Sequence, residues 1–350
     1  MSHDTMTEFE LNHLPSDGIT RVRYIDQQYN QTNHNKNNNL LGVSSWDKSF
    51  RLYNAESNEL LLRSNHESSV MDFCSNPFTQ IIYTATLDGT VHQIDTNTQH
   101  KQHVTSHSSG VKCIEYLSSL NLLMSGSWDG TVQYHDARSN LPTHIHTYTH
   151  DKCKVYTMHC VDSVNNNKPR LVVGLNSRQV YIYDLRKLTQ PEQIRESSLI
   201  NQTRCIQCSP NGTMYVLSSI EGRVSVEYFD PSASVQSNKY AFKCHRQKDP
   251  TTGDTLVYPV NCVVFHPVYH TFATGGADGQ INVWDGDHKK RICQYSPYST
   301  SIASMSFNSS GDKMAVAVSY TYENGEQTNT PQDTVYIRNI NTVEVQPKTK

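Results

Sequence analysis

The chain has 350 residues, a formal net charge of -3 and no long apolar run. A nearly balanced charge gives no global field that would drive the protein onto nucleic acid or a membrane surface. No segment approaches the roughly 20 apolar residues that span a bilayer, and the N-terminus is polar and acidic rather than signal-like. Composition therefore predicts a soluble intracellular protein, with neither nucleic acid nor membrane as a partner, in which any recognition of charge is local.

A repeated unit organises the chain: short alternating strands end in Asp or Asn at regular intervals. Asn54 and Asp95 are 41 residues apart, and Asp230 and Asp285 are 55 apart. These intervals are near the roughly 40 to 45 residues of a WD-type blade once loop insertions are allowed. Tight turns precede most of these strands, at Trp46-Asp47-Lys48, Leu87-Asp88-Gly89, Trp128-Asp129-Gly130, Asn176-Ser177-Arg178, Ile220-Glu221-Gly222 and Ala277-Asp278-Gly279. The pattern predicts an all-β fold, a seven-bladed WD-repeat β-propeller.

The expected propeller covers residues 8–341 as one domain, with an N-terminal tail of residues 1–7 and a polar C-terminal tail of residues 342–350. A short strand from Phe9 to Leu14 precedes the first unit. It is placed to supply the fourth strand of the last blade, because such closure removes the two sheet edges that an open ring would expose.

Four insertions mark surface loops. The polar, low-complexity runs Asn30 to Asn39 and Asn165 to Lys168 fall between the first and second strands of their blades, on one face of the ring. The longer segments Gln247 to Tyr258 and Tyr322 to Gln332 are expected on the opposite face. None of the four carries a recognisable function.

A predicted hairpin brings several cations together. The runs Arg223 to Phe229 and Lys239 to Lys243 alternate with a period of two, which is typical of antiparallel strands. Pairing would place Arg223 beside Lys243, His245 and Arg246 at one sheet edge. We interpret this cluster as a binding site for an anionic group such as a phosphate, held by charge-assisted hydrogen bonds. The alternative is an ordinary solvated charge patch.

Two histidine–aspartate pairs share the same spacing: His66 with Asp88, and His107 with Asp129. With Ser or Thr nearby, such a set resembles a hydrolase triad. Its repetition instead favours buried hydrogen-bond networks that pin the turns. The sequence has no nucleophile elbow, phosphate loop or zinc-protease motif, so we expect no catalytic residue.

Nine cysteines, an odd number, are typical of reduced thiols packed as small apolar residues. Cys205 and Cys208 have metal-like spacing, but residues three apart on a strand point to opposite faces, and no second pair completes a ligand set. We therefore expect neither a metal nor another cofactor.

Blade topology predicts where function lies. In an up-and-down blade, the turn between strands two and three and the loop after strand four share one face, which we call the top face. Trp46 and Trp128 occupy such turns, and exposed aromatics near Arg are typical of binding hot spots. The alternative is that each indole folds back onto its own turn, whereas Trp284, in a strand, is expected in the core. The residues expected on the top face are Trp46, Trp128, Arg178, Arg204, Arg223, Lys243, His245 and Arg246.

Several long strings resemble one family. SSIEGRVSVEYFDPS, YAFKCHR, YPVNCVVFHP and FATGGADGQINVWD are similar to strings of the mitotic spindle-assembly checkpoint WD-repeat proteins of the budding-uninhibited-by-benzimidazole group. The similarity extends from about Phe9 to Asn341. It implies a non-catalytic seven-bladed adaptor, located in the nucleus and at kinetochores in mitosis.

The resemblance also implies partners and site residues. Such adaptors bind a short linear motif of a checkpoint kinase and of its kinase-like relative, which here implies Trp46 and Trp128. We expect Arg178 and Arg204, which blade topology places on the same face, to contribute to this site. They dock on phosphorylated Met-Glu-Leu-Thr repeats of a kinetochore scaffold, which implies Arg223, Lys243 and Arg246 as phosphothreonine ligands. Because position 243 is Lys, a point-charge contact is expected there rather than a bidentate one. An activator of the anaphase-promoting complex is a further implied partner, within an inhibitory checkpoint complex.

The runner-up within this fold is the related nuclear-pore and messenger-RNA export propeller, which binds a nucleoporin motif. It shares a string like Phe-Lys-Cys-His-Arg. SSIEGRVSVEYFD and KKRICQYSPYSTSIAS are more similar to the checkpoint group.

Overall fold

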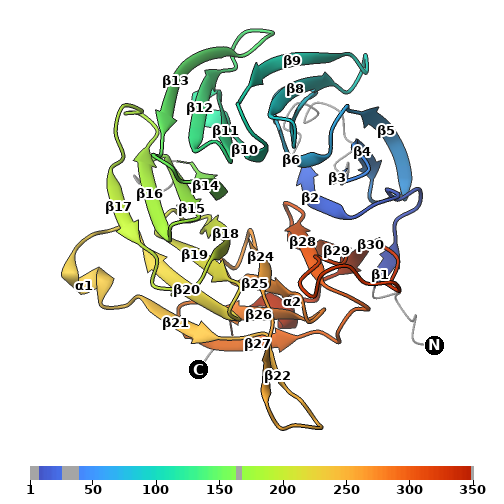
Figure 1. Ribbon diagram of the computed structural model, residues 1–350, viewed down its shortest axis with the longest axis vertical. Coiled ribbons are helices and arrows are strands. Elements are labelled where there is room, and N and C mark those ends of the chain that lie inside the picture. The colour runs from blue at the N-terminus through green and yellow to red at the C-terminus, as the bar shows by residue number, and fades with distance from the viewer. Residues whose placement is uncertain (1–7, 26–38, 163–167, 348–350) are drawn as a thin grey trace.

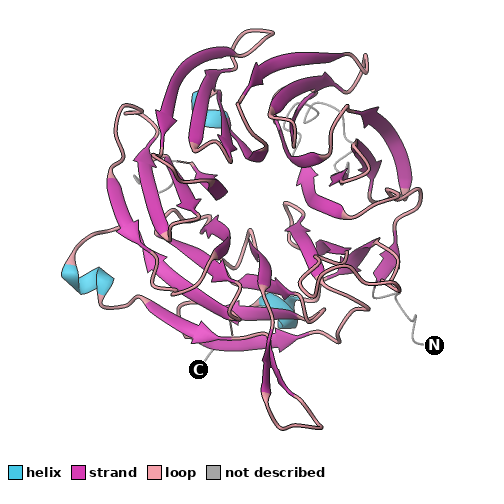
Figure 2. Cartoon of the chain, viewed as in Figure 1, coloured by secondary structure: helices cyan, strands magenta, loops and turns pink. Residues whose placement is uncertain are grey.

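The computed structural model describes residues 8–25, 39–162 and 168–347. Within these residues, seven four-stranded antiparallel sheets surround a central axis, and a two-stranded hairpin projects from the ring (Figure 1). Each four-stranded sheet is one blade. Figure 2 shows that strands and loops make up nearly all of the described chain. The predicted seven-bladed propeller is confirmed.

Blades one to three are built in chain order. Blade one contains β2 (Ile19–Ile25), β3 (Leu40–Ser45), β4 (Ser49–Asn54) and β5 (Glu59–Asn65). Blade two contains β6 (Val70–Ser75), β7 (Ile81–Thr86), β8 (Thr90–Asp95) and β9 (Lys101–Ser106). Blade three contains β10 (Val111–Leu117), β11 (Leu122–Ser127), β12 (Thr131–Asp136) and β13 (Thr143–Thr149), with the 3-10 turn η1 (Ser118–Leu120) after β10.

Blades four to six follow the same order. Blade four contains β14 (Val155–Val161), β15 (Arg170–Leu175), β16 (Gln179–Asp184) and β17 (Gln193–Glu196). Blade five contains β18 (Thr203–Cys208), β19 (Met214–Ser219), β20 (Arg223–Tyr228) and β21 (Tyr240–Lys243), with the short helix α1 (Ala233–Gln236) before β21. Blade six contains β24 (Val260–Phe265), β25 (Phe272–Gly276), β26 (Ile281–Asp285) and β27 (Lys290–Gln294).

Blade seven joins the two ends of the described chain. It contains β28 (Ile302–Phe307), β29 (Lys313–Val318), β30 (Thr334–Asn339) and β1 (Glu8–Glu10). β1 pairs with the outer side of β30, with Phe9 opposite Ile337, and the Leu11 N–H donates to the Val335 carbonyl at 2.9 Å. The predicted closure is confirmed, because β1 completes the blade and covers an edge that would otherwise be open.

The hairpin predicted in blade five also forms. β20 and β21 are antiparallel, and Arg223 lies directly opposite Lys243. Directly opposed residues have Cβ atoms about 4.5–5.5 Å apart, on the same face of the sheet. The connection includes α1 rather than a tight turn. The two cations at the centre of the predicted phosphate site are therefore neighbours.

Each inner strand begins with a β-bulge at the same position of the register. A bulge leaves one residue unpaired and re-aims its side chain. The bulged residues are Thr20, Met71, Lys112, Tyr156, Arg204, Asn261 and Ala303. The propeller thus presents one such side chain per blade near the top of its central channel.

The inner strands are edges, and their free N–H groups are capped by side chains of the preceding blade. The Ile114 N–H donates to Asp72 Oδ2 at 3.1 Å, and the Ile206 N–H donates to Thr157 Oγ1 at 3.0 Å. Buried N–H groups without a partner are costly. These bonds therefore fasten neighbouring blades to each other.

Blade six contains a side-chain network of four residues beneath its turn, in which Asp278 Oδ2 is buried without a hydrogen-bond partner among the described residues. His245 Nδ1 lies 2.8 Å from Asp278 Oδ1, and His245 Nε2 lies 2.9 Å from Thr274 Oγ1. The Trp284 indole N–H donates to the same Thr274 oxygen at 2.9 Å. The expectation that His245 is an exposed cation is wrong, because it is 4% exposed and held in this network. Trp284 is half-buried beside it.

The two predicted histidine–aspartate pairs differ. His107 contacts Thr131 Oγ1 at 2.7 Å and Ser125 Oγ at 2.8 Å, and its Nδ1 lies 3.6 Å from Asp129. The predicted network at His107 is confirmed. The predicted pair of His66 with Asp88 is wrong: neither ring nitrogen of His66 has a hydrogen-bond partner among the described residues.

The segments outside the blades are only partly as expected. Asn30 to Asn38 and most of Asn165 to Lys168 lie outside the described residues. The insertion from Gln247 to Tyr258 belongs to the projecting hairpin of β22 (Arg246–Lys248) and β23 (Thr255–Val257).

The expected C-terminal tail is in part a packed element. Thr342–Val345 form the short helix α2, and Val345 is 1% exposed. The Thr271 hydroxyl of blade six donates to the Val345 carbonyl at 2.7 Å. Residues 342–347 therefore differ from the solvated tail expected from their polarity, because one apolar side chain docks them.

Candidate functional site

The predicted binding residues share one face because of the strand order. Second-to-third-strand turns and the ends of fourth strands meet at the same end of every blade. Trp46, Trp128 and Arg178 lie in such turns, Arg223 begins a third strand and Lys243 ends a fourth strand. The top face thus holds the predicted aromatic and basic residues together.

The two tryptophans lie in equivalent positions with different exposure. Trp46 is 41% exposed, and Trp128 is half-buried. Each indole lies beside a glycine just before the inner strand of its own blade: a Cβ at Gly18 would lie 3.2 Å from Trp46 Cδ1, and one at Gly110 would lie 3.1 Å from Trp128 Cε3. Lys154 Nζ is 6.0 Å from the Trp128 ring centroid. Each ring therefore rests against its own blade, and Trp46 has the larger exposed surface available for contact.

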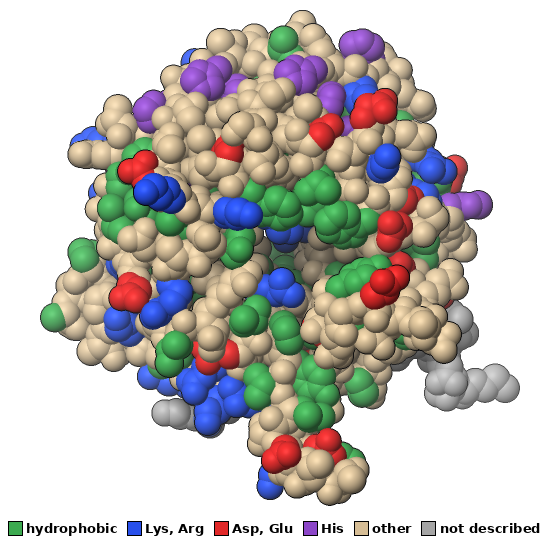
Figure 3. Space-filling view, viewed as in Figure 1, with side chains coloured by type: hydrophobic (Ala, Val, Ile, Leu, Met, Phe, Trp, Pro, Cys, Tyr) green, Lys and Arg blue, Asp and Glu red, His purple; other side chains and the backbone are tan. Residues whose placement is uncertain are grey.

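A cavity of about 520 Å³ opens where the bulged residues converge. Figure 3 shows Lys and Arg side chains beside the opening at the centre of the ring, with hydrophobic side chains around it. Trp46 forms part of the wall, and Tyr320, Thr321 and Tyr322 of the blade-seven loop contribute another part. The remaining lining includes the bulged residues Thr20, Met71, Lys112, Arg204, Asn261 and Ala303.

Two cations line this cavity from blades that are separated by one blade. Lys112 comes from blade three and Arg204 from blade five. Arg204 Nε is buried and has no hydrogen-bond partner among the described residues, and burial lowers the pKa of the Arg204 guanidinium. An anionic group of a ligand would satisfy this donor. Sequence reasoning found Arg204 and missed Lys112; the recurrent second position of each inner strand is the signal that identifies both.

Arg178 is less available than expected. It occupies the left-handed turn position, with φ 67°, where blades two, three, five and six have glycine and blade one has Lys48. Its Nε donates to the Leu199 carbonyl at 3.0 Å and its Nη2 to the Ser197 carbonyl at 3.2 Å, while Nη1 lies 3.2 Å from Glu196. Arg178 thus ties its turn to the loop after β17, and most of its donors are occupied.

The three predicted phosphate ligands have different partners. Lys243 is exposed, and no hydrogen bond or ion pair engages its side chain within the described part of the chain. Arg246 is half-buried, and its Nη2 donates to the Glu221 carbonyl at 2.7 Å. Arg223 Nε lies 3.5 Å from Glu221 Oε2. The cluster therefore holds one free cation, one anchored cation and one cation paired with a carboxylate that sequence reasoning did not consider.

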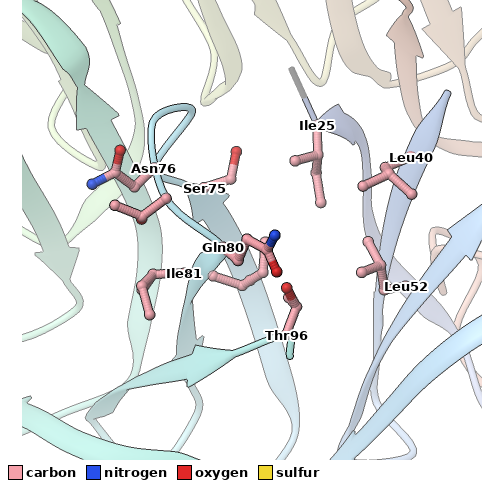
Figure 4. A pocket seen from close by; sticks show the side chains of 10 residues that line it. Ile25, Leu40, Leu52, Ser75, Asn76, Gln80, Ile81 and Thr96 are labelled. Carbon is pink, nitrogen blue, oxygen red and sulfur yellow. The ribbon is translucent and has the colours of Figure 1, made fainter. Parts of the chain in front are cut away.

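A second hollow lies between blades one and two, at the opposite face of the ring from Trp46 (Figure 4). Ile25, Leu40 and Leu52 form one side, and Asn76 and Ile81 form part of the other. No charged residue lines it, and it leaves no room for a ligand. We assign it no binding role.

The described residues contain no group of three or more His, Cys, Asp or Glu arranged to hold a metal ion. Cys205 and Cys208 are buried free thiols of β18, and burial raises the pKa of both. Such thiols are inert packing groups. In the same described ranges, neither helix is long and apolar enough to cross a membrane.

The ring of four-stranded blades and the repeated turn chemistry define the class of this molecule, a WD-repeat β-propeller. A family model described as "WD domain, G-beta repeat" matches residues 251–285, which include Thr274, Asp278 and Trp284 of the blade-six network. A model described as "Nucleolar protein 10-like, N-terminal domain" matches residues 34–226.

Relatives define the family. The chain is 44% identical to "Mitotic checkpoint protein BUB3.1" of Arabidopsis thaliana, over 97% of this chain and 95% of the relative. It is 41% identical to "Mitotic checkpoint protein bub3" of Dictyostelium discoideum, over 97% of both. The chain belongs to the Bub3 family of mitotic checkpoint WD-repeat proteins, so the resemblance is confirmed. Similarity to "mRNA export factor GLE2" of Chaetomium thermophilum is lower, at 32% over 93% of this chain and 88% of the relative.

Proposed function

We propose that this mitotic checkpoint protein is a non-catalytic adaptor that binds two kinds of peptide on its top face. A short linear motif lies across Trp46, Trp128 and the central cavity, with an acidic group at Arg204. A phosphothreonine lies at Arg223, Lys243 and Arg246. The observation that carries the proposal is the direct opposition of Arg223 and Lys243 at the same end of the ring as the open cavity.

The partners follow from the family. The linear motif belongs to a checkpoint kinase and its kinase-like relative, and the phosphothreonine to Met-Glu-Leu-Thr repeats of a kinetochore scaffold. An anaphase-promoting-complex activator joins the same inhibitory complex. The adaptor then acts in the nucleus and, during mitosis, at kinetochores.

Calorimetry with a phosphothreonine Met-Glu-Leu-Thr peptide and its unmodified form tests the phosphate site. Each charge-assisted hydrogen bond contributes about 1.5–3 kcal/mol, so Arg223→Ala with Lys243→Ala should weaken phosphopeptide binding at least about tenfold and abolish the preference for phosphate. Lys239→Ala is the matched control, because Lys239 is an exposed lysine next to the other end of β21. Undiminished preference in the double variant would place the phosphate elsewhere.

The linear-motif site is tested with a peptide of the checkpoint kinase. Trp46→Ala and Trp128→Ala should each weaken binding, with the larger loss at the more exposed Trp46. Phe78→Ala is the control, since Phe78 is 46% exposed and lies between β6 and β7 on the opposite face. Unchanged affinity in both tryptophan variants would move the motif to another surface.

The second candidate is a messenger-RNA export propeller, which the similarity to GLE2 favours. Pull-downs from mitotically arrested and interphase cells separate the two. Recovery of the checkpoint kinase from arrested cells supports the first function, whereas nuclear-pore components in both samples support the second.

A further inference from the structure

The predicted phosphate site contains its own anion. Glu221 stands in the tight turn between β19 and β20, two residues before Arg223, and its Oε2 lies 3.5 Å from Arg223 Nε. The side chain of Glu221 is 17% exposed and that of Arg223 is 34% exposed. Arg223 is therefore already next to a carboxylate before any ligand arrives.

This pair is close but poorly bonded. Arg223 Nε and Glu221 Oε1 are both buried, and neither has a hydrogen-bond partner among the residues that the structure describes. The main chain of Glu221 is fixed, because its carbonyl accepts the 2.7 Å bond from Arg246. The backbone is held while the carboxylate makes only a charge contact, so the pair can be displaced at modest cost.

Blade four offers an internal comparison. Arg178 occupies a neighbouring position of the equivalent turn and also faces a carboxylate, Glu196, at 3.2 Å. There the arginine donates to two main-chain carbonyls, and Glu196 is 72% exposed. Arg178 is used by the fold, whereas the Arg223 side chain has Glu221 as its one charge partner among the described residues. Of the two pairs, the weakly held one is therefore in blade five, at the arginine that faces Lys243.

We propose that the Glu221 carboxylate competes with ligand anions for Arg223, so that the phosphate site needs a highly charged ligand; this inference rests on the function proposed above. A carboxylate ligand that displaces Glu221 exchanges one carboxylate for another and gains little. A phosphate carries about 1.5 to 2 negative charges and three acceptor oxygens, so it can engage Arg223 and the free Lys243 together. Competition by Glu221 thus weakens the binding of any anion at Arg223 by a similar amount, and phosphothreonine still binds because its extra charge also engages Lys243.

The test is calorimetry of wild type and Glu221→Gln with three versions of one Met-Glu-Leu-Thr peptide: phosphothreonine, threonine, and glutamate in place of threonine. Removing a competing ion pair of this exposure should tighten binding about two- to fivefold for the phosphorylated and the glutamate peptides alike. Binding of the threonine peptide should not change, because it brings no anion to Arg223.

Two further variants make the result specific. Glu221→Asp keeps the charge but shortens the side chain, so it should also tighten binding if contact with Arg223 is what matters. Glu196→Gln removes a carboxylate from the equivalent pair in blade four and should leave all three affinities unchanged.

The outcomes separate the two ideas. A wild-type protein that does not prefer the phosphorylated peptide overturns the proposed function itself. If wild type does prefer it, but Glu221→Gln binds it equally or more weakly, only the competitor role is overturned, and Glu221 positions Arg223 instead. Equal gains in Glu221→Gln and Glu196→Gln would mean that net charge, not the local pair, sets the affinity.

Discussion

Blades six and two carry a histidine and an aspartate in corresponding places, yet only blade six joins them. In blade six, His245 bridges Asp278 and Thr274, and Trp284 donates to the same threonine. In blade two, His66 is 7% exposed with both ring nitrogens unbonded within the described residues.

One difference between the two blades lies at the aromatic position. Trp284 is six residues after Asp278, and the residue six after Asp88 is Ile94, which has no donor. Asp88 bonds to Thr86 and Thr90 of its own turn, and His66 packs against the His92 ring at 5.3 Å. A buried polar network contributes more to stability as more of its members are satisfied, and both ring nitrogens of His245 have partners whereas those of His66 have none among the described residues. A histidine and an aspartate in the corresponding places are therefore not sufficient. The side chains around them decide whether a blade has a network.

The largest expected effect comes from breaking blade six. Asp278→Ala leaves His245 buried without its partner, and losses of about 3 kcal/mol in the free energy of unfolding are typical of such breaks. Urea unfolding measures it. Asp88→Ala is the matched control and should cost about 1 kcal/mol, since Asp88 serves only its own turn. Equal losses would remove the distinction between the two blades.

Acid should lower the free energy of unfolding through the buried, unsatisfied histidines. Burial lowers the pKa of His66 to about 3 and that of His135 to about 4, from a model-peptide value near 6.5. Because the folded pKa is depressed, their stability contribution is complete above pH 6.5 and is lost as pH falls toward 4.

The measurement is urea unfolding at pH 7 and pH 5. The double variant His66→Phe with His135→Phe should lose about 2 kcal/mol less free energy of unfolding between pH 7 and pH 5 than the wild type. The upper limit for each histidine is about 1.4 kcal/mol per pH unit, and the expected difference is below the limit for two groups. The acidic and basic groups near His66 are Asp88, His92 and Lys101, and they remain in both proteins. Parallel pH profiles would contradict the assignment.

Blade three should respond to an intermediate degree. His107→Leu removes the bonds to Thr131 and Ser125 and leaves two hydroxyls without that partner. The expected loss in the free energy of unfolding is about 1–2 kcal/mol. A loss as large as that of Asp278→Ala would mean that the indole of blade six adds nothing.

The smallest effect is expected in blade two. His66→Leu removes a side chain that makes no hydrogen bond to the described residues, and replacing an unsatisfied polar group with an apolar one of similar size is nearly neutral or stabilising. Unfolding at pH 7 should change by less than about 0.5 kcal/mol. A loss above about 2 kcal/mol would show that His66 has a partner in solution.

Periodicity was sufficient to predict the ring. Alternating strands, x-Asp-Gly turns and a spare strand at Phe9 determine blade number, strand order and closure, because each depends on neighbours in sequence or on one missing strand. The pairing of Arg223 with Lys243 followed for the same reason. These features depend on main-chain pattern, which a sequence displays directly.

Side-chain partners could not be predicted in the same way. Whether His245 is a surface cation or a buried member of a network depends on Thr274 and Trp284, which belong to the following blade. Lys112 and Arg204 line the same cavity because the bulges of two blades point inward. The docking of residues 342–347 depends on contacts between distant residues, among them the burial of Val345 and the hydrogen bond from the Tyr295 hydroxyl to Glu344.

The pairing of β1 with β30 also has a consequence for biosynthesis. Glu8 and Arg338 are in contact across a sequence separation of 330 residues. Such distant contacts are slow to form, because a long loop must close before they contribute. The ribosome translates β30, the strand that pairs with β1, after six complete blades. In a nascent chain halted before Thr334, β1 therefore lacks its pairing strand. Fully assembled rings should therefore appear only late in synthesis, and truncated products should be selectively exposed to chaperones and proteases.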